Sequence, residues 1–208
     1  YISSEDTGGA KGGQTVVAQI DAWPTGHPSP EGRIVEVLGD PDDPGIDVLA
    51  IIKEYDLPVV FPPHVQAAVD EIPDAIPEAE LSNRLDLRNL ACVTIDPEDA
   101  QDFDDAVSLE ALGNGAFRLG IHIADVGFYV PEGAPLDHEA LTRGTSVYLP
   151  DRVIPMLPER LSSGLCTLRP NEDRLALSVF IHLSTAGRPC GSEIVESVIH
   201  SRARFTYG

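Results

Sequence analysis

The segment of this chain best suited to chemistry is an acidic stretch at residues 94–107, TIDPEDAQDFDDAV. Six acidic residues fall within ten consecutive positions there, and no lysine or arginine interrupts them. Two carboxylates about 4 Å apart repel each other by roughly 1 kcal/mol in bulk water and by about 4 kcal/mol at an effective dielectric constant near 20. A folded cluster therefore requires protons or a cation, and ligands that are all oxygens favour magnesium or manganese over zinc.

The spacing of the aspartates predicts a loop rather than a continuous strand. In an extended segment Asp102 and Asp104 would share one face and Asp105 would lie on the other, while Asp96 would be about a strand length away. All four side chains converge only if the chain forms a loop. The apolar Phe103, which needs burial, is consistent with such a loop between two strands.

Two alternatives to a magnesium site differ in the residues that they require. A calcium-binding EF-hand loop beginning at Asp96 would require a small polar ligand at Ala100, glycine at Gln101 and glutamate at Val107, and all three requirements fail. The other alternative is a solvated acidic loop without chemistry. The apolar, strand-like segments on both sides of the stretch argue against it.

Further motifs follow in series with the acidic stretch: RLDLR at 84–88, HIADV at 122–126, YLP at 148–150 and IPMLP at 154–158. Their order and spacing, across roughly residues 80 to 208, resemble the ribonuclease II and ribonuclease R family of exoribonucleases. The resemblance implies a hydrolase that degrades single-stranded RNA processively from the 3′ end and releases nucleoside 5′-monophosphates. It also implies magnesium as the cofactor, with manganese as the alternative.

The resemblance assigns roles to individual residues. It implies that Asp96, Asp102, Asp104 and Asp105 are the four catalytic, metal-holding aspartates, and that Asp104 is the indispensable one. It also implies that Tyr148 binds RNA by stacking on a base near the scissile phosphate, a contact that holds a single strand without reading its sequence. On the sequence alone, Tyr148 fits a core position equally well.

The expected fold is α+β. We expect residues 81–208 to form the N-terminal part of an RNB catalytic domain, with a largely antiparallel sheet and helices. By the same resemblance, residues 1–45 form the C-terminal part of a cold-shock domain, a partial OB-type β-barrel, and residues 46–80 form a helical linker.

Hydrophobic periodicity predicts the elements of these parts. Helices are expected at 47–55, 63–71 and 136–143, a loop at 23–30 and a hairpin turn at 113–115. Apolar residues at alternate positions of one strand, Leu175, Leu177, Val179 and Ile181, are expected in the core. Strands are expected at residues 14–20, 32–38, 90–95, 106–112, 117–124, 174–184 and 193–207.

Several other polar residues have open interpretations. His122 lies between two isoleucines of a strand, which favours a hydrogen-bonded structural histidine over a metal ligand or acid–base group. Asp125 either approaches the acidic loop or caps the turn before a glycine. Arg84 and Arg88 flank Asp86, which favours a structural ion-pair set over phosphate contacts.

Composition limits where RNA and a membrane can bind. The net charge is −20, but residues 141–208 carry eight basic and six acidic side chains, so an RNA path favours that part. The three cysteines form no Cys-x-x-Cys pair, which predicts neither a disulfide nor a zinc site and makes a reducing cytoplasm the default location. No apolar run has the length of a membrane span, so no membrane association is expected. At full length we expect a monomer.

The chain is expected to be a piece of a longer polypeptide. The resembled family also uses an arginine and a carboxylate from the later half of its nuclease domain, and we expect both to lie beyond residue 208. The piece is therefore expected to be inactive alone. Two other functions remain open: a non-catalytic RNA-binding or regulatory remnant of the same fold, and a metal-dependent nuclease acting on DNA. Whether structured RNA is degraded, and which RNAs are natural substrates, does not follow from the sequence.

Overall fold

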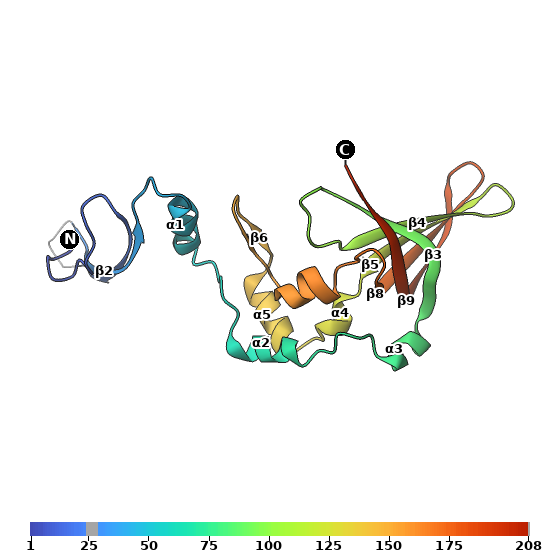
Figure 1. The fold of residues 1–208 in the computed structure, drawn as a ribbon, viewed down its shortest axis with the longest axis horizontal. Coiled ribbons are helices and arrows are strands. Elements are labelled where there is room, and N and C mark those ends of the chain that lie inside the picture. Colours follow the sequence, from blue (N-terminus) through green and yellow to red (C-terminus); the bar gives the residue numbers. More distant parts are fainter. Residues whose placement is uncertain (24–28, 208) are drawn as a thin grey trace. The chain divides into compact units, whose positions relative to one another are not determined.

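The computed structural model describes residues 1–23 and 29–207, and the chain folds into two compact units. The first unit comprises residues 1–60 with 146–154, and the second comprises residues 61–145 with 155–208 (Figure 1). The predicted loop at 23–30 lies mostly outside the described residues. The domain boundaries predicted at residues 45 and 80 stay a prediction.

The first unit contains two small antiparallel hairpins and one helix. Its core is a cluster of three buried residues, Val48, Ile52 and Ile154. Val48 and Ile52 lie one turn apart on the helix, the spacing that predicted it. The elements of this unit are β1 (Thr15–Ala22) paired with β2 (Glu31–Gly39), α1 (Ile46–Glu54), and β6 (Val147–Tyr148) paired with β7 (Val153–Ile154).

The second unit is built on a closed five-stranded barrel in the order β3-β4-β5-β8-β9. Four of the five strand pairs are antiparallel, as expected, and the barrel closes through a parallel pair between β3 and β9. These two strands run side by side in Figure 1. The bounds are β3 (Leu85–Asp96), β4 (Asp105–Ala111), β5 (Phe117–Ala124), β8 (Asp173–Leu183) and β9 (Pro189–Thr206).

The barrel interior combines small and polar side chains with the large ring of Phe180, and this corrects one expectation. On β8 the inward residues are Ala176, Ser178 and Phe180, all buried, whereas Leu177 is 42% exposed. The prediction that the alternating leucine, valine and isoleucine face of β8 is core is wrong beyond Leu175. A five-stranded barrel leaves little internal volume, so one aromatic ring and two small residues fill the inner face of β8, and the aliphatic side chains that follow Leu175 lie on its outer face.

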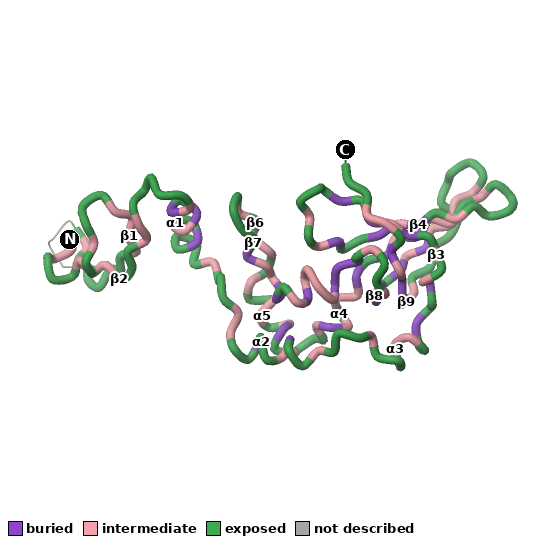
Figure 2. The backbone as a smooth tube through the Cα atoms, in the orientation of Figure 1, coloured by how far each residue is buried: buried purple, intermediate pink, exposed green. Residues whose placement is uncertain are grey.

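Short helices cover one end of the barrel and share an apolar cluster with strands β8 and β9. It includes Val65, Leu136, Leu161 and Leu175. Figure 2 shows buried positions at α2 and α4, whereas the tips of the β4–β5 and β8–β9 hairpins are exposed. The helices are α2 (Pro63–Asp70), α3 (Glu78–Asn83), α4 (Val126–Tyr129), α5 (Pro135–Arg143) and a π-helical turn (Arg160–Leu165).

Two local signals in the sequence explain where elements begin and turn. Pro63 and Pro135 each occupy the first turn of their helix, where the missing N–H costs no hydrogen bond. The predicted hairpin turn between β4 and β5 is confirmed: Gly115 has a φ of 82°, and Leu112 N donates to Ala116 O at 2.8 Å. Within the described part of the chain, no helix is long and apolar enough to cross a membrane.

Candidate active site

The acidic stretch forms a loop whose two ends belong to the barrel, as predicted. Asp96 is the last residue of β3, opposite Thr206 in the parallel ladder with β9. Asp105 is the first residue of β4, opposite Ile123 of β5. Asp104 is held through its backbone, because Ala124 N donates to Asp104 O at 2.9 Å. The strand ends therefore fix where the first and last of the four aspartates lie.

Asp104 lies within the electrostatic field of the other three aspartates. The Asp104 side chain reaches the surface, yet surrounding loop and strand atoms partly desolvate it. This desolvation is the largest cause that raises the pKa of Asp104, followed by repulsion from Asp102, Asp105 and Asp96. A proton or a nearby cation would relieve this accumulated negative charge.

Asp96 supplies a second sign of an incomplete polar site. Its side chain is 8% exposed, and its Oδ2 atom is buried without a hydrogen-bond partner. A buried carboxylate oxygen in this state carries a large desolvation cost. It is thus a suitable ligand for a hard divalent cation, which prefers oxygen.

The geometry, however, is not that of a preformed metal cage. Among residues 1–23 and 29–207, no three His, Cys, Asp or Glu side chains are grouped closely enough to hold a metal ion. Magnesium usually keeps several waters and binds through one or two carboxylates together with substrate phosphates. The donor set therefore fits magnesium in its chemistry, and the assignment of the four aspartates as its ligands stays a prediction.

His122 is a buried structural residue, which confirms the favoured interpretation. Its Nε2 lies 2.9 Å from Ser108 Oγ and its Nδ1 lies 2.7 Å from Ser178 Oγ. Ser178 Oγ is 2.6 Å from Ser197 Oγ, which donates to the Ala176 carbonyl at 3.1 Å. Every group is satisfied if Ser108 donates to Nε2, Nδ1–H donates to Ser178, and Ser178 donates to Ser197. This arrangement requires a neutral imidazole with its proton on Nδ1. Burial lowers the pKa of His122 to about 4.

Asp125 and the buried Arg84 form a partly buried ion pair beside the barrel. Asp125 caps α4 by accepting from Phe128 N at 3.3 Å, and its Oδ2 accepts from Arg84 Nη1 at 2.6 Å. Arg84 Nε donates to Glu80 at 2.8 Å. Burial alone would lower the pKa of Arg84, but these two carboxylates hold it above its usual value. The ion-pair interpretation of Arg84 is confirmed, and its partners are Glu80 and Asp125 rather than the neighbouring Asp86.

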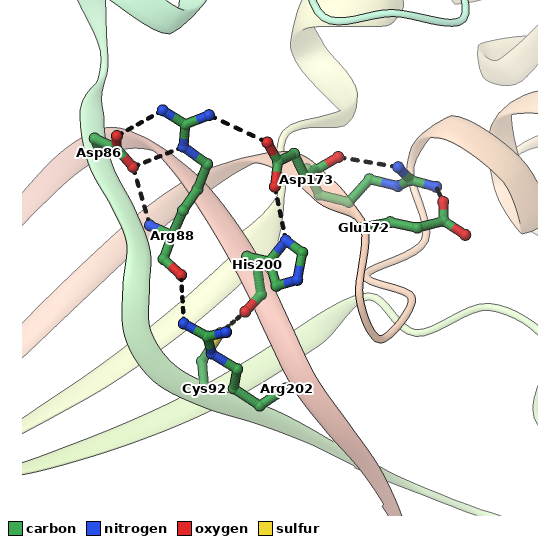
Figure 3. A network of polar contacts seen from close by, with 8 residues as sticks. Asp86, Arg88, Cys92, Glu172, Asp173, His200 and Arg202 are labelled. Carbon is green, nitrogen blue, oxygen red and sulfur yellow. Dashed lines mark hydrogen bonds and ion pairs between the residues drawn. The ribbon is translucent and has the colours of Figure 1, made fainter.

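Arg88 belongs instead to a polar network that connects β3 with β8 and β9 (Figure 3). Its guanidinium contacts Asp86 at 2.6 Å and Asp173 at 3.2 Å, and Asp173 also contacts His200 Nδ1 at 2.7 Å. Arg202 donates to the Arg88 carbonyl at 3.0 Å. The hydrogen bond from Arg88 lowers the pKa of Asp86 to about 2. The ion-pair interpretation of Arg88 is confirmed.

Tyr148 lies on β6 of the first unit. Its side chain is 66% exposed, so the alternative of a core tyrosine is wrong. The predicted contact of Tyr148 with an RNA base stays a prediction. All three cysteines are free, as expected.

Sequence reasoning missed three residues that contact the acidic loop from distant parts of the chain. Thr167 and Leu168 hydrogen-bond to Phe103, and Arg204 contacts the loop from β9. Nothing in their local sequence indicates this role, because the barrel brings them to the loop only when it closes.

Comparison with family models decides the classification. A model described as "RNB domain" matches residues 84–208, and one described as "Cold shock domain" matches residues 1–62. The chain belongs to the RNB family. The RNB match begins one residue before β3 and includes every strand of the barrel.

Curated RNB relatives carry the name ribonuclease R. The chain is 48% identical over 209 residues to ribonuclease R of Thermotoga maritima, covering 100% of this chain and 29% of that protein. It is 46% identical to ribonuclease R of Escherichia coli, covering 96% of this chain and 24% of that protein. The chain thus spans about a quarter to a third of the length of these relatives.

Solved RNB structures share the fold. Mycoplasma genitalium RNase R in complex with double-stranded RNA matches with a TM-score of 0.90 and 29% identity, over 100% of this chain and 37% of that one. The same protein in complex with ribose-methylated single-stranded RNA gives 0.90 and 30% over the whole of this chain and 32% of that one. Yeast Ssd1, described as a pseudonuclease, has the same fold at a TM-score of 0.73 and 24% identity, over 93% and 25% of the two chains.

Proposed function

We propose that this chain carries the metal-binding part of a 3′→5′ exoribonuclease that hydrolyses single-stranded RNA processively to nucleoside 5′-monophosphates. The observation that supports this most strongly is the environment of Asp104. Its pKa is raised by desolvation and then by three other aspartates of one loop, in a chain of the RNB family whose relatives are named ribonuclease R. The M. genitalium RNase R complexes with RNA support RNA as the ligand.

The proposed site residues have distinct roles. Asp96, Asp102, Asp104 and Asp105 hold magnesium, or manganese in its place, directly or through water. When bound, such ions lower the pKa of the attacking water and neutralise charge on the phosphate. Asp104, whose pKa is raised by desolvation and by its acidic neighbours, is the carboxylate whose charge a bound cation would stabilise most. Tyr148 holds a base of the single strand by stacking.

The experiment exchanges one carboxylate for an amide of nearly the same shape. Asp104→Asn, in a polypeptide completed to the length of the relatives, should abolish turnover while RNA binding stays nearly intact, because the change removes a ligand charge and also lessens repulsion of phosphate. Single-turnover digestion of labelled RNA and filter binding measure the two effects. Asp99→Asn is the matched control, since Asp99 is an exposed acid of the same loop outside the proposed set.

Three outcomes would contradict the proposal. Cleavage by Asp104→Asn above about a tenth of the parent rate would remove Asp104 from its central role. Internal cuts, in place of a ladder with released mononucleotides, would exclude exonuclease action. Equal competition by labelled DNA would contradict selectivity for RNA, because the 2′-hydroxyl distinguishes the two.

A non-catalytic RNA-binding remnant is the second candidate, and one observation favours it: no three acidic, histidine or cysteine side chains among the described residues form a ready metal group. The two candidates differ in metal dependence. Digestion by the completed polypeptide that requires magnesium supports the nuclease. RNA binding without any digestion, at every magnesium concentration, supports the remnant.

A further inference from the structure

Phe103, the residue between Asp102 and Asp104, is fixed at both of its backbone polar groups. Its N–H donates to Thr167 Oγ1 at 2.6 Å, and its carbonyl accepts from Leu168 N at 2.8 Å. Its ring is buried, with 7% of the residue exposed. A residue held by N–H, carbonyl and ring cannot rotate, so the Cα–Cβ directions of the two flanking aspartates are set.

Arg204 of β9 holds the same ring and the opposite half of the loop. Its guanidinium carbon lies 4.7 Å from the Phe103 ring centroid, a cation–π arrangement. Its Nη2 donates to Pro97 O at 2.5 Å and to Glu98 O at 2.8 Å. One side chain therefore connects the part of the loop that follows Asp96 with the part between Asp102 and Asp104.

Such fixation is needed because the loop contains groups that repel one another. Asp96, Asp102, Asp104 and Asp105 are like charges within ten residues of one loop, so their mutual repulsion favours an open, splayed loop. The hydroxyl of Thr167 and the guanidinium of Arg204 oppose that opening. Thr167 is fully buried, with 0% of its surface exposed, so it cannot touch RNA and acts only through Phe103.

We propose that Thr167 and Arg204 are positioning residues of the nuclease reaction, which fix the relative placement of the four aspartates through Phe103 and the loop carbonyls. The inference rests on the proposed function. Misplacing a catalytic group by about 1 Å can cost on the order of 100-fold in rate. Neither residue holds the metal, so each acts only by placing the aspartates. The loss should therefore appear both in turnover and in metal affinity.

The test compares Thr167→Val with Thr167→Ser. Valine keeps the shape of threonine and removes the acceptor of the Phe103 N–H, whereas serine keeps the hydroxyl and removes a methyl group. In the completed polypeptide, Thr167→Val should lower kcat for mononucleotide release at least 10-fold, leave the KM for RNA within about 3-fold, and raise the magnesium concentration for half-maximal rate. Thr167→Ser should stay within about 3-fold of the parent on all three.

A readout independent of catalysis uses the 208-residue chain itself. Electron paramagnetic resonance titration with Mn²⁺ should show weaker binding by Thr167→Val than by Thr167→Ser, and hydrogen exchange should show faster exchange of the Phe103 amide. A merely structural threonine would lower the melting temperature without separating the Val and Ser variants in metal affinity. Equal Mn²⁺ affinity of Val and Ser would overturn the proposal.

Arg204 provides the second variant if Thr167→Val does not fold. Arg204→Lys keeps the charge but cannot reproduce the planar contact with the ring and two carbonyls. It should lose at least 10-fold in kcat, close to the loss in Arg204→Met. Full activity of Arg204→Lys would assign Arg204 a role through charge alone and overturn its positioning role.

The design separates the two proposals. If the parent digests RNA and Asp104→Asn does not, but Thr167→Val matches the parent, the positioning inference fails and the proposed function stands. If the completed parent digests no RNA, the proposed function fails, while Mn²⁺ affinities of the Val and Ser variants still decide whether Thr167 organises the aspartates.

Discussion

The buried hydrogen-bond chain through His122 predicts a stability that falls in acid. His122 is fully buried, and its pKa of about 4 lies below the value near 6.5 expected in the unfolded chain. Between these two values the unfolded state binds a proton that the folded state does not bind, so stability rises with pH across this window. It is fully present above pH 6.5, is lost as pH falls toward 4, and changes no further below that.

The magnitude follows from the difference of about 2.5 pKa units. At 1.36 kcal/mol per unit, His122 should account for about 3 kcal/mol of unfolding free energy between pH 7.5 and pH 4. The physical reason is visible in the network. A protonated ring would donate from both nitrogens, so the hydroxyl hydrogen of Ser108 would lose its acceptor at Nε2.

The assay is urea unfolding at several pH values for the parent and for His122→Gln. Glutamine offers an acceptor and a donor to the same neighbours but does not titrate, so the difference between the two proteins cancels other titrating groups. Trp23 belongs to the first unit, so its fluorescence does not report on the barrel. Unfolding of the barrel should therefore be followed by far-UV circular dichroism and by the amide peaks of β5 and β8. Between pH 7.5 and pH 4, the unfolding free energy of the parent should fall by about 3 kcal/mol more than that of His122→Gln. A difference that stays constant with pH would refute the reasoning, as would nitrogen chemical shifts that place the proton on Nε2.

Two further substitutions test other parts of the structure. Gly120→Ala should destabilise the barrel by about 1–3 kcal/mol, because the added methyl group would overlap Ser108 Oγ and come within 2.8 Å of His122 Nε2. A thermal melt measures this, and an unchanged melting temperature would contradict the packing described. Tyr148→Ala in the completed polypeptide should change the length of the final RNA product more than it slows digestion of long RNA, because one lost stack of about 1–3 kcal/mol is diluted over many contacts while the substrate is long. Tyr148→Phe, which keeps the ring, should keep the product length, and an unchanged product in the alanine variant would remove Tyr148 from the site.

The strands were predictable from the sequence because residue types alternate along a strand whose two faces have different environments, inside and outside the barrel. Phe117–Ala124 was predicted with its observed bounds, and the acidic loop was correctly placed between two strands. The identity of the buried face was not predictable by hydrophobicity. On β8, Ser178 points inward and Leu177 outward, since a narrow barrel selects for size and for hydrogen bonding to His122.

In the candidate site, the carboxylates were predictable from the sequence and the residues that support them were not. Its carboxylates were found because six acids in ten residues are a local feature of the chain. Its supports were not found, because Thr167 and Arg204 reach the loop from positions about 60 and 100 residues further along the chain. The π-helical turn before Thr167, and the pairing of Arg84 with Asp125, likewise depend on packing between elements far apart in sequence.

The parallel pairing of β3 with β9 has a consequence for the order of folding. Asp105 enters a ladder as soon as the β4–β5 hairpin forms, whereas Asp96 is opposite Thr206, about 110 residues further along. During synthesis on the ribosome, β3 keeps one unpaired edge until β9 has emerged, and such edges are exposed to aggregation. The same delay leaves the acidic loop without Arg204, and Asp96 without its partner on β9, until that strand docks. The hydrogen bonds from Arg204 to the Pro97 and Glu98 carbonyls therefore form in one late step, after the pairing of β3 with β4 has already brought the repelling aspartates into one loop.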